Sequence, residues 1–320
     1  MFYNKQDAEG IMARRLEAAR QPGETSAIGR LLTWRQRRLI IAFLFVLPAL
    51  INFAVFRYIP IVEAFRASLY QYSLLGGFGE FVGLAHYNRM LTDPVFWRSL
   101  QATLLFVLYK VPLQIALSLG LAILLTRQTV GTGIVRSAIL TPMVTSIIIV
   151  SIIWAMMYQS QNGLFQSMLV TLGFRKIPFL SDTRYALPAV SVMMIWKDIG
   201  FSFIIFVAGL KGIPEMYYEA AIVDGATRRQ LFRHITIPLL KPVLMFVIVT
   251  QTIFSFQVFV PVYQMTRGGP LDSTKVIVYY IYQQGFNFQD MGYASAISMV
   301  TLVLLLLISW GQMRFLRSDD

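Results

Sequence analysis

The chain has 320 residues, of which 56% are hydrophobic and only 14% are charged, and its mean hydropathy is +0.61. These values are too apolar for a soluble protein of this length and indicate a protein that crosses the membrane several times. Because the chain has no cysteine, disulfides, thiolate catalysis and cysteine-based metal sites are excluded. Its two histidines, His86 and His234, leave few ligands for any other metal site. The net charge of +12 fits contact with anionic lipid, and we do not expect nucleic-acid binding.

Residues 1–38 precede the first long apolar segment. They lack the short basic region, brief apolar core and small-residue cleavage site of a signal peptide. We therefore expect a cytoplasmic tail. It is either flexible or held on the inner leaflet as an amphipathic helix by Arg14, Arg15 and Arg20.

Six apolar segments are long enough to cross a bilayer as helices, because about 20 residues match a hydrocarbon core of about 30 Å. They are 39–56, 102–125, 137–158, 185–210, 243–265 and 292–315. Five of them contain an internal proline, which predicts kinked helices. These prolines are Pro48, Pro112, Pro142, Pro188 and Pro261. The predicted fold class is all-α, a six-span bundle over residues 39–316 with a short cytoplasmic tail at 317–320.

The distribution of lysine and arginine predicts the orientation of these spans. Basic residues in the connections are more numerous on the side of the amino terminus than on the other side. Since basic residues favour the cytoplasmic side, both termini and the connection 211–242 should be cytoplasmic. Residues 57–101 then form one large outer loop.

The connection between the fourth and fifth apolar segments carries capping signals for two short helices. Pro214 suits the first turn of a helix that ends at Gly225, which can take the left-handed conformation. Thr227 and Gln230 have the spacing of a capping box, so a second short helix should begin there and end before Pro238.

Small side chains lie on the first of these short helices. Ala220 and Ala221 follow Glu219 and would let the backbone of a partner approach closely. The projection is therefore either a docking surface for a cytoplasmic partner or an ordinary loop that covers the end of the bundle.

Three motifs resemble those of a known family. The first resembles the EAA signature of the membrane subunits of binding-protein-dependent ABC importers, and comprises Glu219-Ala220-Ala221, Asp224-Gly225-Ala226, Phe232, Ile235, Pro238 and Pro242. The second is similar to the GGP motif of the carbohydrate-uptake branch, which includes the maltose and glycerol-3-phosphate permeases, and comprises Thr266-Arg267-Gly268-Gly269-Pro270 and Thr274. The third lies in the outer loop and fits the same branch, with Phe81-Val82-Gly83-Leu84, Tyr87, Asp93-Pro94 and Phe96-Trp97.

The resemblance implies the MetI-like fold of a type I importer permease in the bacterial inner membrane. In that family the EAA segment is the coupling helix, which sits in a cleft of a cytoplasmic ATPase. The residues that carry this role over to the present chain are Glu219, Ala220, Ala221, Asp224 and Gly225. The implied partners are a second homologous permease, an ATPase homodimer and a periplasmic solute-binding protein. ATP and Mg would be bound by the ATPase, and since this chain lacks a phosphate-binding glycine-rich loop we expect it to be non-catalytic and without a cofactor.

Polar residues within the fourth and fifth spans suggest a pathway for a sugar. Buried polar groups in spans usually face a cavity or the bundle interior. Gln251 and Ser255 are four residues apart and share a helix face. Aromatic rings could stack on a sugar while polar side chains bond its hydroxyls. The candidate pathway residues are Trp196, Asp198, Phe201, Gln251 and Ser255, and the resemblance implies that equivalent regions line the path in maltose-type relatives.

Other interpretations of the same polar residues stay open. Gln251 and Ser255 could instead bond to neighbouring helices, and Lys197 could reach a backbone carbonyl. Lys110, in the second span, is expected to extend outward to the membrane surface. A different class, an ion-coupled secondary transporter, would use Lys197 or Asp198 as its coupling site. No catalytic cluster and no metal-ligand pattern is found in the sequence.

Overall fold

A computed structural model describes residues 34–126 and 131–316. The chain forms two compact units, residues 1–62 and 63–320, which are described separately. Most of the expected amino-terminal tail and the whole of the expected tail at 317–320 lie outside the described residues.

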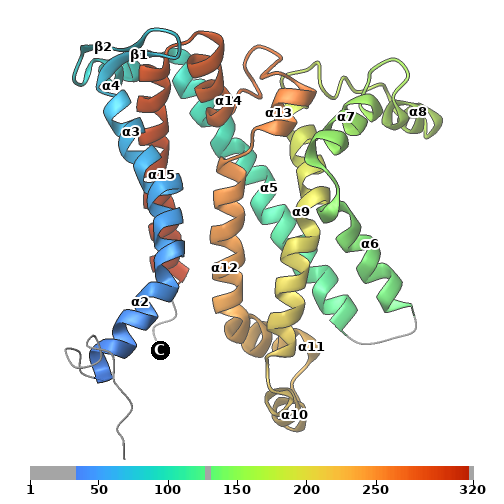
Figure 1. Cartoon of the computed structure of the whole chain (residues 1–320). Coiled ribbons are helices and arrows are strands. Elements are labelled where there is room, and N and C mark those ends of the chain that lie inside the picture. Colours follow the sequence, from blue (N-terminus) through green and yellow to red (C-terminus); the bar gives the residue numbers. More distant parts are fainter. Residues whose placement is uncertain (1–33, 127–130, 317–320) are drawn as a thin grey trace, which may run out of the picture. The chain divides into compact units, whose positions relative to one another are not determined.

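The first unit contains one long apolar helix (Figure 1). Helix α2 (Trp34–Phe53) continues through a π-helical turn, η2 (Ala54–Tyr58), into α3 (Ile59–Ala67), whose last residues belong to the second unit. The apolar helix runs from Arg38 to Ala67, so it is longer than the expected span 39–56 and contains residues assigned to the outer loop. None of its described side chains is buried up to Val62, and such an apolar helix requires lipid or a protein partner around it.

The second unit contains the rest of the bundle and a small two-stranded sheet. The sheet is an antiparallel hairpin of β1 (Tyr70–Ser73) and β2 (Gly77–Phe81). The helices are α4 (Ala85–Thr92), α5 (Pro94–Thr126), α6 (Thr132–Val144), α7 (Ile147–Met157), α8 (Leu164–Thr171), α9 (Ala186–Lys211), α10 (Glu215–Val223), α11 (Arg228–Leu231), α12 (Ile237–Phe256), α13 (Val260–Met265), α14 (Ile277–Tyr282) and α15 (Met291–Leu316). Two π-helical turns are η3 (Phe232–Thr236) and η4 (Gln283–Asn287).

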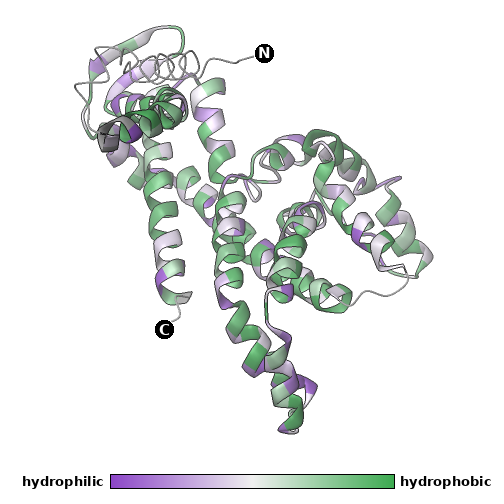
Figure 2. Cartoon of the chain, turned by 60° about the horizontal axis from the view of Figure 1, so that its bottom comes forward, coloured by the Kyte–Doolittle hydropathy of each residue, from purple (hydrophilic) through white to green (hydrophobic). Residues whose placement is uncertain are grey.

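Five helices of the described chain are long and apolar enough to cross a membrane, and there are six if α6 and α7 together form one span. Apolar residues predominate along these helices (Figure 2). Helices α6 and α7 meet at an angle of 100°. The break follows Pro142, where Thr145 and Ser146 take extended backbone angles. The expected kink at this proline is therefore present, but it is large enough to break the span in two.

The expected end of the fifth span was wrong. The fifth span was expected to reach Met265, but α12 ends at Phe256 and α13 begins at Val260. Pro261 has no N–H to continue the ladder of α12, and it occupies the first turn of α13, where none is needed.

The second short helix of the cytoplasmic connection was expected to end before Pro238. Instead α11 passes through η3 into α12, and the Ile237 N–H bonds to the Phe232 carbonyl in the wider π-helical turn. This turn places Pro238 in the first turn of α12, where the missing N–H does not break the helix. The result is one helical segment from Arg228 to Phe256.

Asp93 joins four parts of the second unit at the end opposite the connection 211–242. Its carboxylate accepts hydrogen bonds from the hydroxyl of Tyr280 on α14, from that of Tyr293 on α15 at 2.6 Å, and from the N–H of Val95 at 2.8 Å. Burial alone would raise the pKa of Asp93, but these hydrogen bonds lower it below its ordinary value. Pro94 is the first residue of α5. Asp93 therefore joins the start of α5 to α14 and α15.

The packing of α6 against α9 depends on a glycine. A Cβ atom on Gly200 of α9 would lie 2.8 Å from the carbonyl oxygen of Ile139 on α6. Interfaces between membrane helices commonly use small residues for such close approach. Gly200 therefore sets the distance between the two helices.

We expect Gly200→Ala to lower stability by about 1–3 kcal/mol, because the added methyl group meets backbone that cannot move aside. Gly120→Ala in α5 is the matched control, since a Cβ there has no neighbour within 4 Å, and it should be neutral or slightly stabilising. Thermal unfolding of the purified variants in detergent measures both effects. Equal midpoints for the two variants would contradict this account of the contact.

Candidate functional site

A cluster of polar side chains lies inside the second unit, where α5, α9 and α12 meet. The polar cluster consists of Lys110 and Gln114 from α5, Asp198 and Ser202 from α9, and Gln251 and Ser255 from α12. The Lys110 ammonium donates to Asp198 Oδ2 at 2.7 Å and to Gln251 Oε1 at 3.3 Å. Lys110 is fully buried, whereas the side chain of Asp198 is 23% exposed. The pair thus joins a buried cation to a carboxylate that solvent can reach.

Amide and hydroxyl groups complete the polar cluster. The side-chain amides of Gln114 and Gln251 each donate to Ser202 Oγ at 3.1 Å. Gln114 also donates to the Asp198 carbonyl at 3.1 Å, and Ser255 donates to the Gln251 carbonyl at 2.6 Å. Each of the three helices therefore contributes groups that bond to another helix or fix a neighbour, which sets the rotation of the helices relative to one another.

The predicted pathway residues are only partly brought together. Gln251 and Ser255 are fully buried and bond within the polar cluster. Trp196 is 41% exposed and its ring lies 5.5 Å from that of Trp154 on α7. Phe201 instead approaches Phe254 on α12, with ring centroids 5.8 Å apart. Contact of these residues with a substrate stays a prediction.

Sequence reasoning was wrong about Lys110, which was expected to extend outward. Its side chain points into the bundle because Asp198 and Gln251 supply acceptors there. A signal for this was present. Lys110, Gln114 and Ser118 are spaced by four residues, so they form one polar stripe along α5.

Lys197 has a different role from its neighbour Asp198. Its ammonium donates to the carbonyl of Met143 at 2.9 Å, in the last turn of α6. The last carbonyls of a helix have no partner within the helix, and a lysine can satisfy one of them. This bond agrees with the interpretation that Lys197 reaches a backbone carbonyl. Lys197 thus caps α6 where the span breaks.

The predicted end of the first short helix in the connection is confirmed. Helix α10 ends at Val223, and Gly225 has φ +82°. The Gly225 N–H bonds to the Ile222 carbonyl at 3.0 Å and the Ala226 N–H to the Ala221 carbonyl at 2.9 Å. This pair of bonds is a Schellman motif, which requires the left-handed residue that glycine supplies.

The predicted capping box after this turn is also confirmed. The Gln230 N–H bonds to Thr227 Oγ1 at 3.4 Å, and the Thr227 N–H bonds to Gln230 Oε1 at 2.8 Å. Helix α11 therefore begins at Arg228 with its first free N–H groups satisfied. The turn between α10 and α11 is held by local bonds on both sides.

Helix α10 lies beyond the ends of α9 and α12 (Figure 1). None of its residues is buried. Its exposed side chains include Met216, Ile222 and Val223, the last of which is 87% exposed. Apolar side chains exposed on a projecting helix indicate a surface that another protein covers.

The second sequence motif forms a tight turn between α13 and α14. Thr274 Oγ1 lies 2.7 Å from both Thr266 Oγ1 and the Gly269 carbonyl oxygen. Gly268 has φ +83°, and a Cβ there would lie 2.8 Å from the Tyr279 ring. The glycine and the threonines of this motif are thus needed for the turn itself. Within the described residues no group of three His, Cys, Asp or Glu could hold a metal ion.

We expect Lys110→Met to lower stability by about 3 kcal/mol, because it leaves Asp198 charged beside a buried apolar group. The double variant Lys110→Met/Asp198→Asn should recover most of the loss, since no unpaired charge remains. Lys197→Met is the matched control and should not be improved by Asp198→Asn. A thermal unfolding cycle on the purified chain measures the coupling, and additive effects of the two single substitutions would show that the pair is not coupled.

Comparisons with known proteins place these features in a family. Residues 114–317 match the family described as "Binding-protein-dependent transport system inner membrane component". The chain is 36% identical to the probable ABC transporter permease protein YesP of Bacillus subtilis, over 83% of this chain and 87% of the relative. It is 33% identical to the sulfoquinovosyl glycerol transport system permease protein SmoG of Agrobacterium fabrum, over 88% of this chain and 92% of the relative. It is 35% identical to the trehalose/maltose transport system permease protein MalF of Thermococcus litoralis, over 86% of this chain and 92% of the relative.

A solved structure has the same fold. A chain of a bacterial alginate ABC transporter, solved in complex with an alginate pentasaccharide-bound periplasmic protein, superposes with a TM-score of 0.77 at 24% identity, covering 88% of this chain and 95% of that one. The expected fold class, an all-α MetI-like permease, is confirmed. The chain belongs to the family of binding-protein-dependent transport system inner membrane components.

Proposed function

We propose that this chain is a permease subunit of an ATP-driven importer for a sugar or sugar-like solute in the bacterial inner membrane. Relatives over most of its length are named for the transport of trehalose and maltose, lactose and sulfoquinovosyl glycerol. These solutes share polyhydroxylated rings, so a carbohydrate is the solute class that the comparisons support. Family membership does not support the alternative of an ion-coupled secondary transporter.

The observation that carries the proposal is the projecting helix α10 with its glycine turn. In our proposal the surface formed by Glu219, Ala220, Ala221, Asp224 and Gly225 docks into a cytoplasmic ATPase homodimer, which binds ATP and Mg. The small alanines allow close approach, and the exposed Met216, Ile222 and Val223 supply apolar area for the contact. This chain then contributes no catalytic residue.

A side-chain hydrogen bond followed by one continuous helix connects this docking surface to the polar cluster. Tyr218 on α10 bonds to Thr236 in η3, with the two hydroxyl oxygens 3.0 Å apart. From there the helical segment that begins at Arg228 extends to Phe256 and includes Gln251 and Ser255. Closure of the ATPase would therefore move α12 as a rigid element and change the access of solute to the pathway.

The proposed pathway uses the exposed side of the polar cluster. Lys110 holds one carboxylate oxygen of Asp198, and the exposed part of that carboxylate is available to accept a bond from a sugar hydroxyl. Trp196 and Phe201 would supply ring faces. Gln251 and Ser255, which are buried in this conformation, would reach solute only after the helices move.

The other proposed partners are a second homologous permease and a periplasmic solute-binding protein that delivers the sugar. The alginate transporter of the same fold was solved with its periplasmic protein, which supports the second partner. We also propose that both termini and α10 are cytoplasmic, since the basic connections lie on that side.

We expect Gly225→Val to uncouple the transporter, because a β-branched residue strongly disfavours φ near +82°. No atom lies within 4 Å of a Cβ at this position, so the effect would come from backbone strain alone. Gly225→Asn is the matched control, since asparagine tolerates this conformation. The complex is purified in mild detergent and its ATPase activity is measured with and without loaded solute-binding protein.

The valine variant should lose the ATPase or its stimulation, and the asparagine variant should keep most of both. A valine complex that holds its ATPase at full stoichiometry with normal stimulation would contradict the role of the glycine turn in docking.

We expect Trp196→Ala to reduce sugar uptake by roughly fivefold at low solute concentration, because loss of a ring face costs about 1 kcal/mol of solute affinity. Trp310→Ala on α15 is the matched control, being 60% exposed and remote from the polar cluster in the sequence. Uptake of labelled sugars by cells measures the effect, and assembly is checked by co-purification. Equal uptake by the two variants would assign Trp196 to packing against Trp154.

A further inference from the structure

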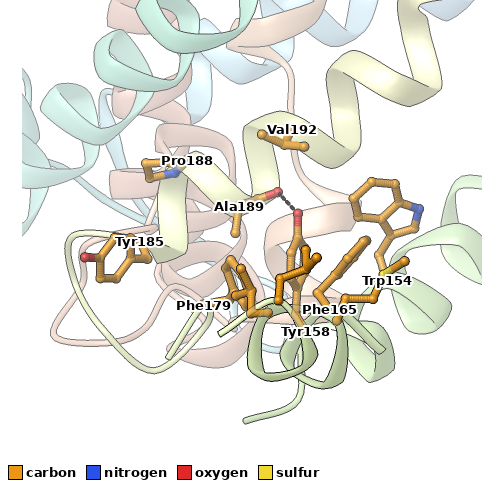
Figure 3. Close-up of a pocket in the computed structure, with 11 residues that line it drawn as sticks. Trp154, Tyr158, Phe165, Phe179, Tyr185, Pro188, Ala189 and Val192 are labelled. Atoms are coloured by element: carbon orange, nitrogen blue, oxygen red, sulfur yellow. Dashed lines mark hydrogen bonds between the residues drawn. The ribbon is translucent and has the colours of Figure 1, made fainter. Parts of the chain in front are cut away.

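A cavity that the proposed pathway does not use lies between α7, α8 and α9. Its volume is about 420 Å³, which is within the range of ligand sites. Aromatic rings from Trp154, Tyr158, Phe165 and Phe179 form much of its wall (Figure 3). The remaining lining residues include Met168, Leu172, Pro188, Ala189 and Val192.

The wall of this cavity presents only apolar atoms. The hydroxyl of Tyr158 donates to the Ala189 carbonyl at 3.1 Å, so its polar end is already satisfied (Figure 3). Polar solutes such as sugars require bonding groups that this wall does not have. The occupant that fits the wall is a hydrocarbon chain.

Helix α8 forms one side of the cavity and bears exposed apolar side chains, two of which, Met168 and Leu172, also line the cavity. Leu164, Met168 and Leu172 are spaced by four residues and are all more than half exposed. Exposed apolar side chains on a helix of a membrane protein normally lie in lipid or against protein. The cavity and the exposed face of α8 together extend the apolar environment of the bundle to its end opposite α10 (Figure 1).

The segment after α8 carries cations next to the cavity. Arg175 and Lys176 lie between the lining residues Leu172 and Phe179, and both are exposed without an ion pair in the described chain. The buried Gln166 fixes this segment, because its amide donates to the Ile177 carbonyl and its carbonyl accepts from the Ile177 N–H at 3.1 Å. The cations therefore lie on a segment that is fixed at Ile177 and flanked on both sides by the lining residues Leu172 and Phe179.

We propose that this cavity binds an acyl chain of an anionic phospholipid, whose headgroup phosphate pairs with Arg175 and Lys176. Apolar walls select the chain, and the two cations select an anionic headgroup over a zwitterionic one. The charge pattern is the reason to favour lipid over a helix of another subunit, since two adjacent exposed cations on the segment between Leu172 and Phe179 can pair with one phosphate. This inference depends on the membrane location of the chain and not on the solute it carries.

Tryptophan fluorescence can test the proposal, because Trp154 lines the cavity. The full chain keeps Trp154 while the other four tryptophans, Trp34, Trp97, Trp196 and Trp310, are replaced by phenylalanine. It is reconstituted in phosphatidylcholine vesicles with increasing fractions of phosphatidylglycerol or phosphatidylcholine that carries brominated, quenching acyl chains. We expect Trp154 to be half-quenched at a fraction of brominated phosphatidylglycerol at least threefold lower than that of brominated phosphatidylcholine.

Two further variants separate the headgroup from the chain. Arg175→Gln/Lys176→Gln should abolish the preference for phosphatidylglycerol, and Val192→Phe should fill the cavity and weaken quenching by both lipids. A chain that keeps only Trp97 is the control, and its quenching should not respond to these substitutions. If the quenching of Trp97 does change with these substitutions, the test rests on the chain without them, and on whether brominated phosphatidylglycerol quenches its Trp154 at a lower fraction than brominated phosphatidylcholine.

Equal quenching of Trp154 by the two brominated lipids, or no quenching, would overturn the proposal. So would a preference that survives removal of both cations, because the phosphate would then have no role. Absence of quenching would also indicate that another copy of the chain or a membrane protein covers the cavity.

Discussion

The ion pair between Lys110 and Asp198 is the interaction on which the interior of the bundle depends. A charge within a membrane span must be paired, because lipid offers no solvent to stabilise it. Lys110 is fully buried, so its position is determined by where Asp198 and Gln251 place their oxygens. This requirement aligns α5, α9 and α12 at one level and leaves little freedom for any of them to rotate separately. The same physical demand acts on backbone groups, where Lys197 satisfies the Met143 carbonyl at the broken end of α6.

The continuity of α12 with the helical end of the connection 211–242 gives that alignment a mechanical consequence. A loop between α11 and α12 would bend and absorb a displacement of α10. The π-helical turn η3 instead keeps the chain helical past Pro238, so in our proposal a displacement of α10 would be carried to Gln251. Because Gln251 bonds to both Lys110 and Ser202, movement of α12 would have to rearrange the polar cluster. In the proposed mechanism, opening of the pathway and movement of α10 would therefore be parts of one structural change.

Local sequence patterns were sufficient for much of the fold and insufficient for the polar cluster. The positions of the long helices follow from the length of the apolar segments. Gly225, Thr227 and Gln230 specify the turn between α10 and α11 through bonds to near neighbours. Pro238 misled the prediction, since the rule that proline ends a helix does not include the wider turn that accommodates it. Lys110 and Asp198 are 88 residues apart, so their pairing is a product of helix packing. The stripe of Lys110, Gln114 and Ser118 predicts a polar face but not the helix that it meets.

The two ends of the second unit differ in how strongly their elements are joined to one another. At one end, Asp93 ties α4, α5, α14 and α15 together, and the threonines and glycines of residues 266–274 close a turn beside them. Hydrogen bonds between residues so distant in sequence restrict the movement of these helices relative to one another. At the other end, α10 has no buried residue and is held by its turn and by Tyr218. The end held by these bonds can act as a fixed support for the long helices, whereas α10 has no core of its own and is the part that the proposed ATPase would cover. In our proposal the conformational change begins at α10, because none of its residues is buried and it is held by its turn and the Tyr218 bond.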